Sequence, residues 1–277
     1  MERTNTYPLA LGYEELCRIL GELDNRHACA KLCYIGESLF GRPIPCVLIG
    51  EGRLCVYVGG FCGCDGAVTR VLLGFALEYA AAIEKGGRIY NIDSGYLAAR
   101  RTLCIIPQLN PDGGELSLHG AGEDCPLRER LLRMNGSSDF SLWQGNGRGC
   151  DLRYNFAPSL ADAFRGEYPE SEPETAALAR FLRMNPAAHP ILAFTDSGAS
   201  PAIRRCRTAP RTAGCASMLS RLSGFPEREE DKSLCGLLRF AASERMHPAL
   251  EVDFGGMDAA AGYARLREVM FTAPVLG

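Results

Sequence analysis

The stretch Gly59-Gly60-Phe61-Cys62-Gly63-Cys64-Asp65-Gly66 decides how this chain is interpreted. The apolar run at residues 54–58 predicts a strand that ends at the two glycines, and a helical pattern begins at Ala67. A loop that joins a strand to a helix in this way can present two metal ligands three residues apart, as a His-x-x-Glu pair would. This chain has Cys62 and Asp65 at that spacing.

Three further segments resemble those of zinc carboxypeptidases. Residues 106–113 (Ile-Pro-Gln-Leu-Asn-Pro-Asp-Gly) are similar to the Asn-Pro-Asp-Gly segment of that family. Residues 146–156 (Asn-Gly-Arg-Gly-Cys-Asp-Leu-Arg-Tyr-Asn-Phe) resemble its Asn-x-Arg-Gly-Val-Asp-Leu-Asn-Arg-Asn-Phe segment, and residues 171–175 (Ser-Glu-Pro-Glu-Thr) resemble the start of its next long helix. Residues 135–143 are similar to the bacterial γ-D-glutamyl-diamino-acid peptidase branch. The resemblance covers roughly residues 40–256.

Strand and helix patterns alternate along the chain, which predicts an α/β fold with three layers, α/β/α, around a mixed and mostly buried central sheet. The resemblance implies the zinc carboxypeptidase fold, as a single domain over residues 1–277. Expected helices lie at 13–24, 66–84, 172–184, 211–222 and 257–270. Expected strands lie at 45–50, 54–59, 102–107, 191–194 and 248–254.

Two local patterns between these elements carry their own predictions. Glu51-Gly52-Arg53 separates the first two strands and predicts a hairpin between them. The charged segment 226–233 is expected in a solvated loop. The arginines Arg204, Arg205, Arg207 and Arg211 predict either a solvated loop, which we favour, or a rim that attracts anions.

Composition is that of an ordinary globular protein, with 47% hydrophobic and 23% charged residues. The net charge of −3 gives no reason to expect nucleic acid as a partner. No apolar run approaches the roughly 20 residues that span a bilayer, so we expect no membrane partner. The first residues show no secretory pattern, and the 13 cysteines fit buried thiols in a reducing compartment. We therefore expect a cytoplasmic protein, of bacterial type by its resemblance.

The resemblance implies a zinc site made by a His and a Glu at the first junction and a second His after a later strand. These ligand slots fall on Cys62, Asp65 and Thr195, and Asp196 is a possible substitute for Thr195. The four histidines (His27, His119, His189 and His247) match no ligand slot. A thiolate is a good zinc ligand, whereas the aspartate is one methylene shorter than Glu and the threonine hydroxyl is a poor ligand.

Further slots concern the general base and the substrate. Asp253 occupies the general-base slot, and Glu251 lies on the same face of its strand. Arg148, Arg153 and Tyr154 fall on substrate-binding positions; the last two replace an Asn and a basic residue. Asp151 falls on a carboxylate that orients the first His, and without that His we expect it to cap a turn or to pair with an arginine.

These substitutions lead to three interpretations of the function. The first is a carboxypeptidase-like protein that is catalytically impaired and keeps a cleft for the carboxylate of a peptide or peptidoglycan-derived small molecule. Zinc, the family's cofactor, would then be absent or weakly bound. The second is an active metallocarboxypeptidase or γ-D-glutamyl peptidase with an unusual Cys/Asp metal site. The third is a hydrolase that uses Cys62 as its nucleophile, which would need a nearby base.

Overall fold

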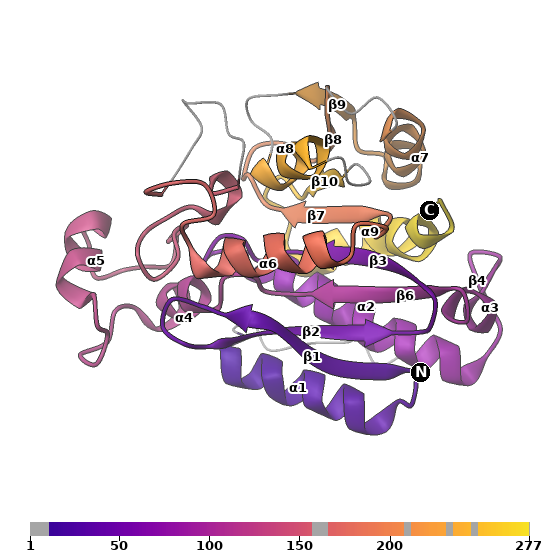
Figure 1. Ribbon diagram of the computed structural model, residues 1–277, viewed down its shortest axis with the longest axis horizontal. Helices are drawn as coiled ribbons and strands as arrows, with labels where there is room; N and C mark the ends of the chain where they lie inside the picture. Colours follow the sequence, from indigo (N-terminus) through magenta and orange to yellow (C-terminus); the bar gives the residue numbers. More distant parts are fainter. Residues whose placement is uncertain (1–10, 157–165, 208–211, 231–234, 245–248, 277) are drawn as a thin grey trace.

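The computed structural model describes residues 11–156, 166–207, 212–230, 235–244 and 249–276 (Figure 1). Arg211, His247 and the amino-terminal segment, on which predictions were made above, lie outside the described residues. A central sheet has the order β1-β2-β6-β3-β7-β10-β8-β9. Its strands are β1 (Ala30–Glu37), β2 (Pro43–Ile49), β3 (Arg53–Val58), β6 (Arg101–Ile106), β7 (Ile191–Thr195), β8 (Ala202–Cys206), β9 (Glu227–Glu230) and β10 (Ala249–Asp253).

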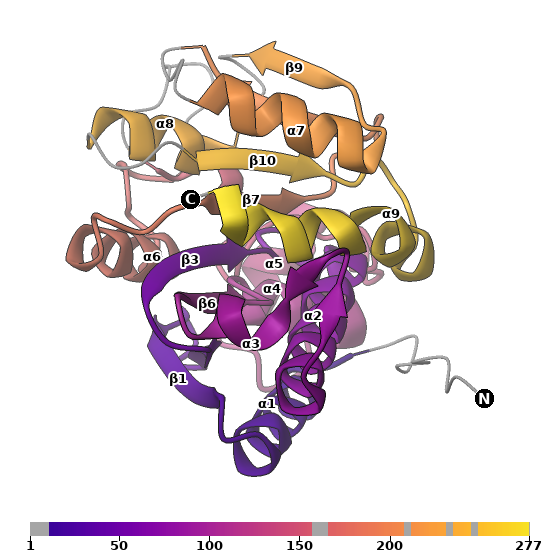
Figure 2. The same ribbon diagram turned by 90° about the vertical axis from the view of Figure 1, so that its right-hand side faces the viewer.

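Helices cover both faces of this sheet. One face packs against α1 (Tyr13–Arg26), α2 (Gly66–Lys85), α7 (Ala213–Ser223) and α9 (Ala259–Thr272). The other packs against α6 (Pro173–Met184) and α8 (Gly236–Ser243). Figure 2 shows these two groups of helices on opposite sides of the strands. The central strands β6, β3, β7 and β10 run parallel, whereas β2 against β6 and β8 against β10 are antiparallel. The mixed three-layer α/β/α fold is confirmed.

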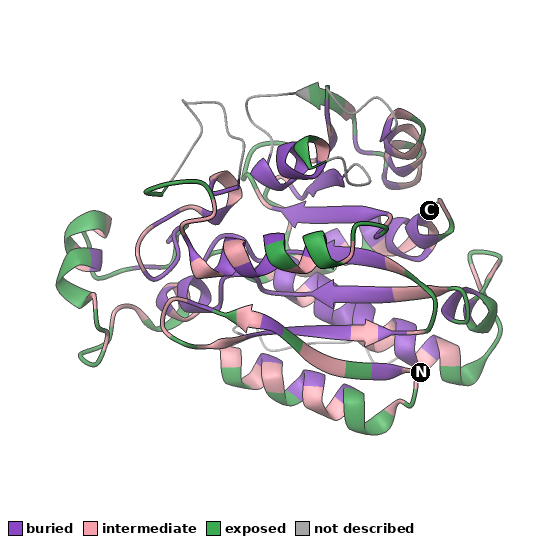
Figure 3. Cartoon of the chain, viewed as in Figure 1, coloured by how far each residue is buried: buried purple, intermediate pink, exposed green. Residues whose placement is uncertain are grey.

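Alternating side chains on the central strands contribute to two apolar cores, one on each face of the sheet. In β3, Cys55 and Tyr57 join the core beneath α2, and Val56 and Val58 join the core beneath α6. Both faces are therefore apolar; β7 and β10 are buried along their length, and β3 and β6 are buried beyond their first two residues (Figure 3). By length and composition α2 could cross a membrane, but 56% of its most apolar window is buried against the rest of the fold, as in the core helix of a globular protein.

The predicted hairpin between residues 45–50 and 54–59 is wrong. Both strands form, as β2 and β3, but β6 lies between them. Ile105 of β6 pairs with Val47 of antiparallel β2 on one side and with Tyr57 of parallel β3 on the other. A turn signal reports only the local reversal of the chain. The strand that pairs with β2 and β3 is β6, which follows about fifty residues later in the chain.

Other elements appear where loops were expected. Strand β9 occupies residues of the charged segment 226–233, and β8 contains Arg204 and Arg205. The segment after β6 contains α4 (Pro111–His119), α5 (Arg128–Asn135) and the short 3-10 helix η1 (Leu152–Tyr154). Helix α5 stands away from the sheet and is largely exposed (Figures 1 and 3). The remaining elements are the small pair β4 (Arg88–Ile89) and β5 (Ile92–Asp93), α3 (Ser94–Ala98) and η3 (Ala273–Leu276).

Candidate functional site

The loop between β3 and α2 is held against the segment that follows β6. Leu109 and Asn110 donate their backbone N–H groups to the carbonyls of Gly59 and Gly60, each at 2.9 Å, and the Asn110 amide donates to the carbonyl of Phe61 at 3.0 Å. A Cβ on Gly63 would come within 2.4 Å of the Gly113 carbonyl oxygen. The glycine therefore permits a close backbone contact, and this contact places Cys62 and Asp65 at the carboxyl end of β3.

Cys62 and Asp65 lie side by side in this loop and are both buried. The Cys62 amide donates to Asp65 Oδ2 at 2.9 Å, and no described residue forms a hydrogen bond with Asp65 Oδ1. Burial raises the pKa of Asp65 to about 7, although the hydrogen bond from Cys62 and the charge of Arg153 act in the opposite direction. Burial, together with the nearby carboxylates Asp65 and Asp151, raises the pKa of the Cys62 thiol well above its ordinary value.

Asp151 and Arg153 form a bidentate ion pair beside this loop. Arg153 Nε donates to Asp151 Oδ1 at 3.0 Å and Nη2 donates to Oδ2 at 2.7 Å, while the Arg153 amide also donates to Oδ1 at 3.0 Å. Asp151 therefore both caps a turn and pairs with an arginine. Cys62 Sγ lies 4.0 Å from the same Oδ1 atom. The structure thus brings together Cys62, Asp65, Asp151 and Arg153.

Thr195, at the predicted later ligand slot, is the last residue of β7 and is 1% exposed. Its hydroxyl donates to Glu251 Oε1 at 2.7 Å, and the other oxygen of Glu251 accepts the Cys235 amide at 3.1 Å. Burial raises the pKa of Glu251, partly offset by this hydrogen bond and by the charge of Arg204. Asp196 uses Oδ1 to accept the backbone amides of Gly198 and Gly256, at 3.0 and 2.7 Å.

Asp253, at the predicted general-base slot, is fully buried and ion-paired with Arg204. Its carboxylate also accepts the Ser197 amide at 3.0 Å and the Ser197 hydroxyl at 2.5 Å. Arg204 Nη1 lies 3.7 Å from Glu251 Oε1 as well. The solvated loop predicted for Arg204 is wrong, because this side chain is 8% exposed and faces two carboxylates of the neighbouring strand β10. Asp253 pairs with Thr195 in the sheet register, but the Thr195 hydroxyl forms its hydrogen bond with Glu251.

These residues do not fit the three-ligand zinc site that the resemblance implies. Such a site needs three protein ligands and an open position for water. Cys62 and Asp65 could supply a sulfur and an oxygen, but the third slot holds a neutral hydroxyl that is already donated to Glu251. Within the described ranges, no group of three or more His, Cys, Asp or Glu side chains is arranged to hold a metal ion.

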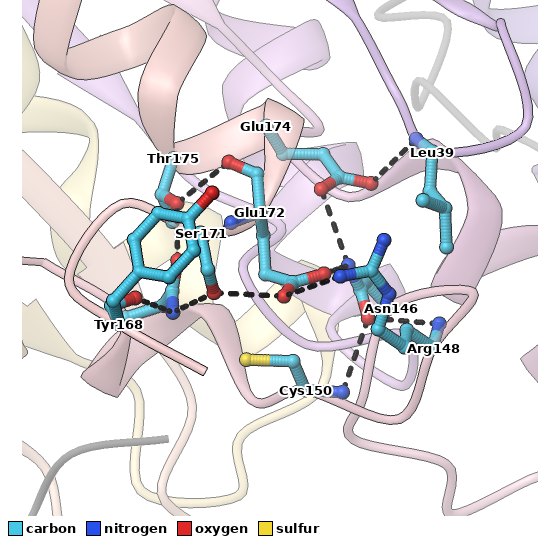
Figure 4. Close-up of polar contacts among 10 residues, drawn as sticks. Leu39, Asn146, Arg148, Cys150, Tyr168, Ser171, Glu172, Glu174 and Thr175 are labelled. Carbon is cyan, nitrogen blue, oxygen red and sulfur yellow. Dashed lines mark hydrogen bonds and ion pairs between the residues drawn. The ribbon is translucent and has the colours of Figure 1, made fainter. Parts of the chain in front are cut away.

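Arg148 lies in a glycine-flanked loop next to a buried polar network (Figure 4). Its Nη1 atom is 3.5 Å from Oε1 of the fully buried Glu172, and its side chain is 30% exposed. Asn146 donates from Nδ2 to Glu172 at 2.8 Å and to Glu174 at 3.2 Å, and its Oδ1 atom accepts the amides of Arg148 and Cys150. This network was not predicted from the sequence, although both glutamates belong to the Ser-Glu-Pro-Glu-Thr segment.

Tyr154 and the remaining arginines have varied roles. The Arg153 guanidinium carbon lies 5.6 Å from the centre of the Tyr154 ring, close enough for a cation–π contact. Arg205 pairs with Glu227 at 2.8 Å, and the more exposed Arg207 lies 3.5 Å from Glu229. These two side chains join β8 to the edge strand β9.

Comparison with known proteins agrees with this architecture. A curated relative, the γ-D-glutamyl-L-diamino acid endopeptidase 1 of Lysinibacillus sphaericus, is 27% identical over 245 residues, covering 80% of this chain and 59% of its own length. An uncharacterized Bacillus subtilis protein, YqgT, is 30% identical over 169 residues, covering 55% of this chain and 45% of its own length. This chain therefore spans about half of the length of these relatives.

Solved structures share the fold at low sequence identity. Bovine thrombin-activatable fibrinolysis inhibitor superposes with a TM-score of 0.74 at 14% identity, covering 96% of this chain and 95% of that one. The murein-tripeptide amidase MpaA of Escherichia coli O157 superposes with a TM-score of 0.56 at 18% identity, covering 88% and 90%. Residues 18–199, more than half of the chain, match the zinc carboxypeptidase family. The protein therefore belongs to the zinc carboxypeptidase family.

Proposed function

We propose that this protein is a catalytically impaired zinc carboxypeptidase homologue that keeps a cleft for the carboxylate of a peptide or cell-wall fragment. The observation that carries the proposal is the 2.7 Å hydrogen bond from Thr195 to Glu251. Hydrolysis in this family relies on a metal that activates water and on a base beside it. Here Thr195, at the later ligand slot, donates a hydrogen bond to the buried carboxylate of Glu251 and is not available as a metal ligand.

The names of the relatives suggest the class of ligand. One is an endopeptidase named for a γ-D-glutamyl-L-diamino acid bond, and another is an amidase named for a murein tripeptide. Both names describe peptides that carry free carboxylates. We therefore propose a murein-type peptide as the ligand of this chain.

Arg148 is the side chain best suited to meet such a carboxylate. Glu172, its buried partner, already accepts hydrogen bonds from Ser171 Oγ at 2.9 Å and from Asn146 at 2.8 Å. Among the described residues Arg148 forms one ion pair, the 3.5 Å contact with Glu172, which leaves most of the five guanidinium N–H donors available for a ligand. A carboxylate could take a two-pronged contact with the exposed part of this group. Arg153, which was also predicted to bind substrate, is instead engaged with Asp151.

Calorimetric titration with a γ-D-glutamyl-diamino-acid peptide tests the binding role. We expect weak binding that Arg148→Ala reduces roughly tenfold, since a charge-assisted contact contributes about 1.5–3 kcal/mol. Arg267→Ala is the matched control, because Arg267 is 32% exposed and also ion-paired, with Glu78 on α2. Equal affinity of the parent and Arg148→Ala, with both folded, would leave Arg148 a structural residue and contradict the binding role.

Metal content and hydrolysis test the impaired activity. After dialysis we expect well under one zinc per chain and no cleavage of the same peptide. Close to one zinc per chain, lost in Cys62→Ser together with hydrolysis, would instead establish the active Cys/Asp metallopeptidase. Hydrolysis without metal that a thiol reagent abolishes, and that Cys62→Ser removes while Cys64→Ser does not, would establish Cys62 as a nucleophile.

A cytoplasmic location is part of this proposal. All 13 cysteines are free thiols in the structure. Free thiols persist in reducing compartments and tend to pair in oxidising ones. Fractionation of cells that produce the protein, with a thiol-labelling count on the recovered chain, tests this point.

A further inference from the structure

One cation and two carboxyl groups are buried together with a thiol beside the loop after β3. The residues are Cys62, Asp65, Asp151 and Arg153. We call this group the Arg153 cluster. It contains two carboxyl groups, one thiol and one guanidinium, and all four side chains are mostly shielded from solvent. The side chains of Arg153 and Asp151 are 12% and 14% exposed, and Asp65 and Cys62 are less exposed still.

The guanidinium is the cation of this cluster. It holds both oxygens of Asp151, at 3.0 and 2.7 Å, and it acts electrostatically on both Cys62 and Asp65. Its other contacts with described residues are to neutral groups, Gln144 Oε1 at 3.2 Å and the Tyr154 ring. Burying carboxylates without a compensating positive charge is costly. Arg153 is therefore the group that allows these acidic side chains to lie together away from water.

Arg153 occupies a position that is uncharged in the family pattern. In the segment that resembles the family pattern Asp-Leu-Asn-Arg-Asn-Phe, this chain reads Asp151-Leu152-Arg153-Tyr154-Asn155-Phe156. A neutral amide of the family pattern is thus replaced by a fixed positive charge. The replacement occurs beside Cys62 and Asp65, the two residues at the first ligand slots, and in a chain whose third slot is Thr195.

We propose that Arg153 is a built-in counter-cation that takes over the electrostatic role of a metal ion in this cluster and excludes divalent cations from it. The orphan Oδ1 of Asp65 marks the atom left for a competing cation, because Asp65 is only 3% exposed and no described residue bonds to that oxygen. Without the guanidinium, the Cys62 sulfur and the Asp151 oxygen 4.0 Å from it lose their neighbouring positive charge, and a thiolate sulfur suits a soft divalent ion such as Cd²⁺. This inference does not depend on ligand binding at Arg148.

The test compares Cd²⁺ binding by the parent, Arg153→Asn and Arg153→Lys, using the ultraviolet charge-transfer band of a cadmium–thiolate bond. Each is measured with and without Cys62→Ser. The difference between the two spectra removes the contribution of the other thiols and leaves the band due to Cys62. We expect a new Cys62-dependent site in Arg153→Asn, roughly tenfold or more tighter than in the parent, since a nearby like charge has been removed. Arg153→Lys keeps a positive charge and should resemble the parent.

Arg205→Asn is the matched control. The Arg205 side chain is 15% exposed, close to the 12% of Arg153, and it also pairs with two carboxylates, but those pairs lie at the sheet edge. It should create no Cys62-dependent band. A folded Arg153→Asn without such a band, or a parent that already binds Cd²⁺ through Cys62 as tightly, would overturn the proposal.

A folding measurement covers the case in which Arg153→Asn unfolds. Its near-ultraviolet circular dichroism should then return on addition of Cd²⁺ and not of Mg²⁺, and failure to return would also overturn the proposal. The peptide titration described for Arg148 is repeated on Arg153→Asn. A Cd²⁺ result as expected, combined with no peptide binding by the parent, would count against the proposed function alone.

Discussion

The hydroxyl of Thr195, at the end of β7, donates to Oε1 of Glu251 on the parallel strand β10 at 2.7 Å. Both side chains are buried, and they lie on the sheet face that α8 covers. This bond joins the residue predicted as a metal ligand to the carboxylate nearest to it. It serves the packing of the two strands, and its contribution to folding can be measured separately from any activity.

Thr195→Val should destabilise the protein by about 1–3 kcal/mol, because Glu251 Oε1 loses its hydroxyl donor while it stays buried. Thr195→Ser keeps the hydroxyl and should cost clearly less. Urea unfolding of both variants measures the difference. Equal losses in the two would show that the hydroxyl contributes nothing to stability.

Arg204→Ala should lower the free energy of unfolding by about 3–5 kcal/mol, because it leaves the buried carboxylate of Asp253 without its charged partner. Arg205→Ala, on the same strand, should cost only about 0–1 kcal/mol, as expected for ion pairs near the surface. Denaturant titrations of the two variants provide the comparison. A small effect at Arg204 would mean that the Ser197 bonds, with the Gly255 amide that donates to Asp253 Oδ1 at 3.0 Å, satisfy Asp253 on their own.

Gly63→Ala should strongly destabilise the loop, because its Cβ would come within 2.4 Å of the Gly113 carbonyl oxygen. Gly66→Ala is the control: no atom lies within 4 Å of its Cβ position, at the start of α2. That change should be neutral or should stabilise by up to about 1 kcal/mol through helix propensity. Thermal melts decide, and a harmless Gly63→Ala would contradict the close backbone contact.

Stability should fall as the pH rises from about 4.5 to about 7 because of Glu174. Burial raises the pKa of Glu174 from 4.5 to about 7, so in this window the folded chain keeps a proton that the unfolded chain has lost. The fall should be about 1–3 kcal/mol and should level off above pH 7. Glu174→Gln cannot titrate and should show a shallower dependence between pH 5 and 8. Unfolding curves at several pH values measure both slopes, and parallel slopes would assign the effect to other groups.

Much of the frame of this fold could be predicted from sequence, because its signals are local. The apolar run of β3, the two glycines and the apolar helix after them occur within about thirty residues. The strand before the Asn-Pro-Asp-Gly segment and the helix after Ser171 are similarly self-contained. Each prediction needed only neighbouring side chains, and β3, α2, β6 and α6 are all present.

The rest depended on partners far away in the chain. The position of β6 between β2 and β3 follows from the packing of the whole sheet, which no turn signal contains. Arg204 has the composition of a solvated residue and is buried because Asp253, 49 residues later, lies on the adjacent strand. In the same way Arg148 had no predicted partner nearby in the sequence, and its partner in the structure is Glu172, the residue that precedes α6.

The edge strand β9 has a consequence for how molecules of this protein meet one another. Among the described residues its backbone pairs with β8 alone, and Glu227 and Glu229 form ion pairs with Arg205 across that pairing. An unpaired sheet edge invites a strand from another chain, and charged side chains on an edge make that addition unfavourable. All four residues of β9 are charged, so the addition of a strand from a second molecule at this edge is disfavoured.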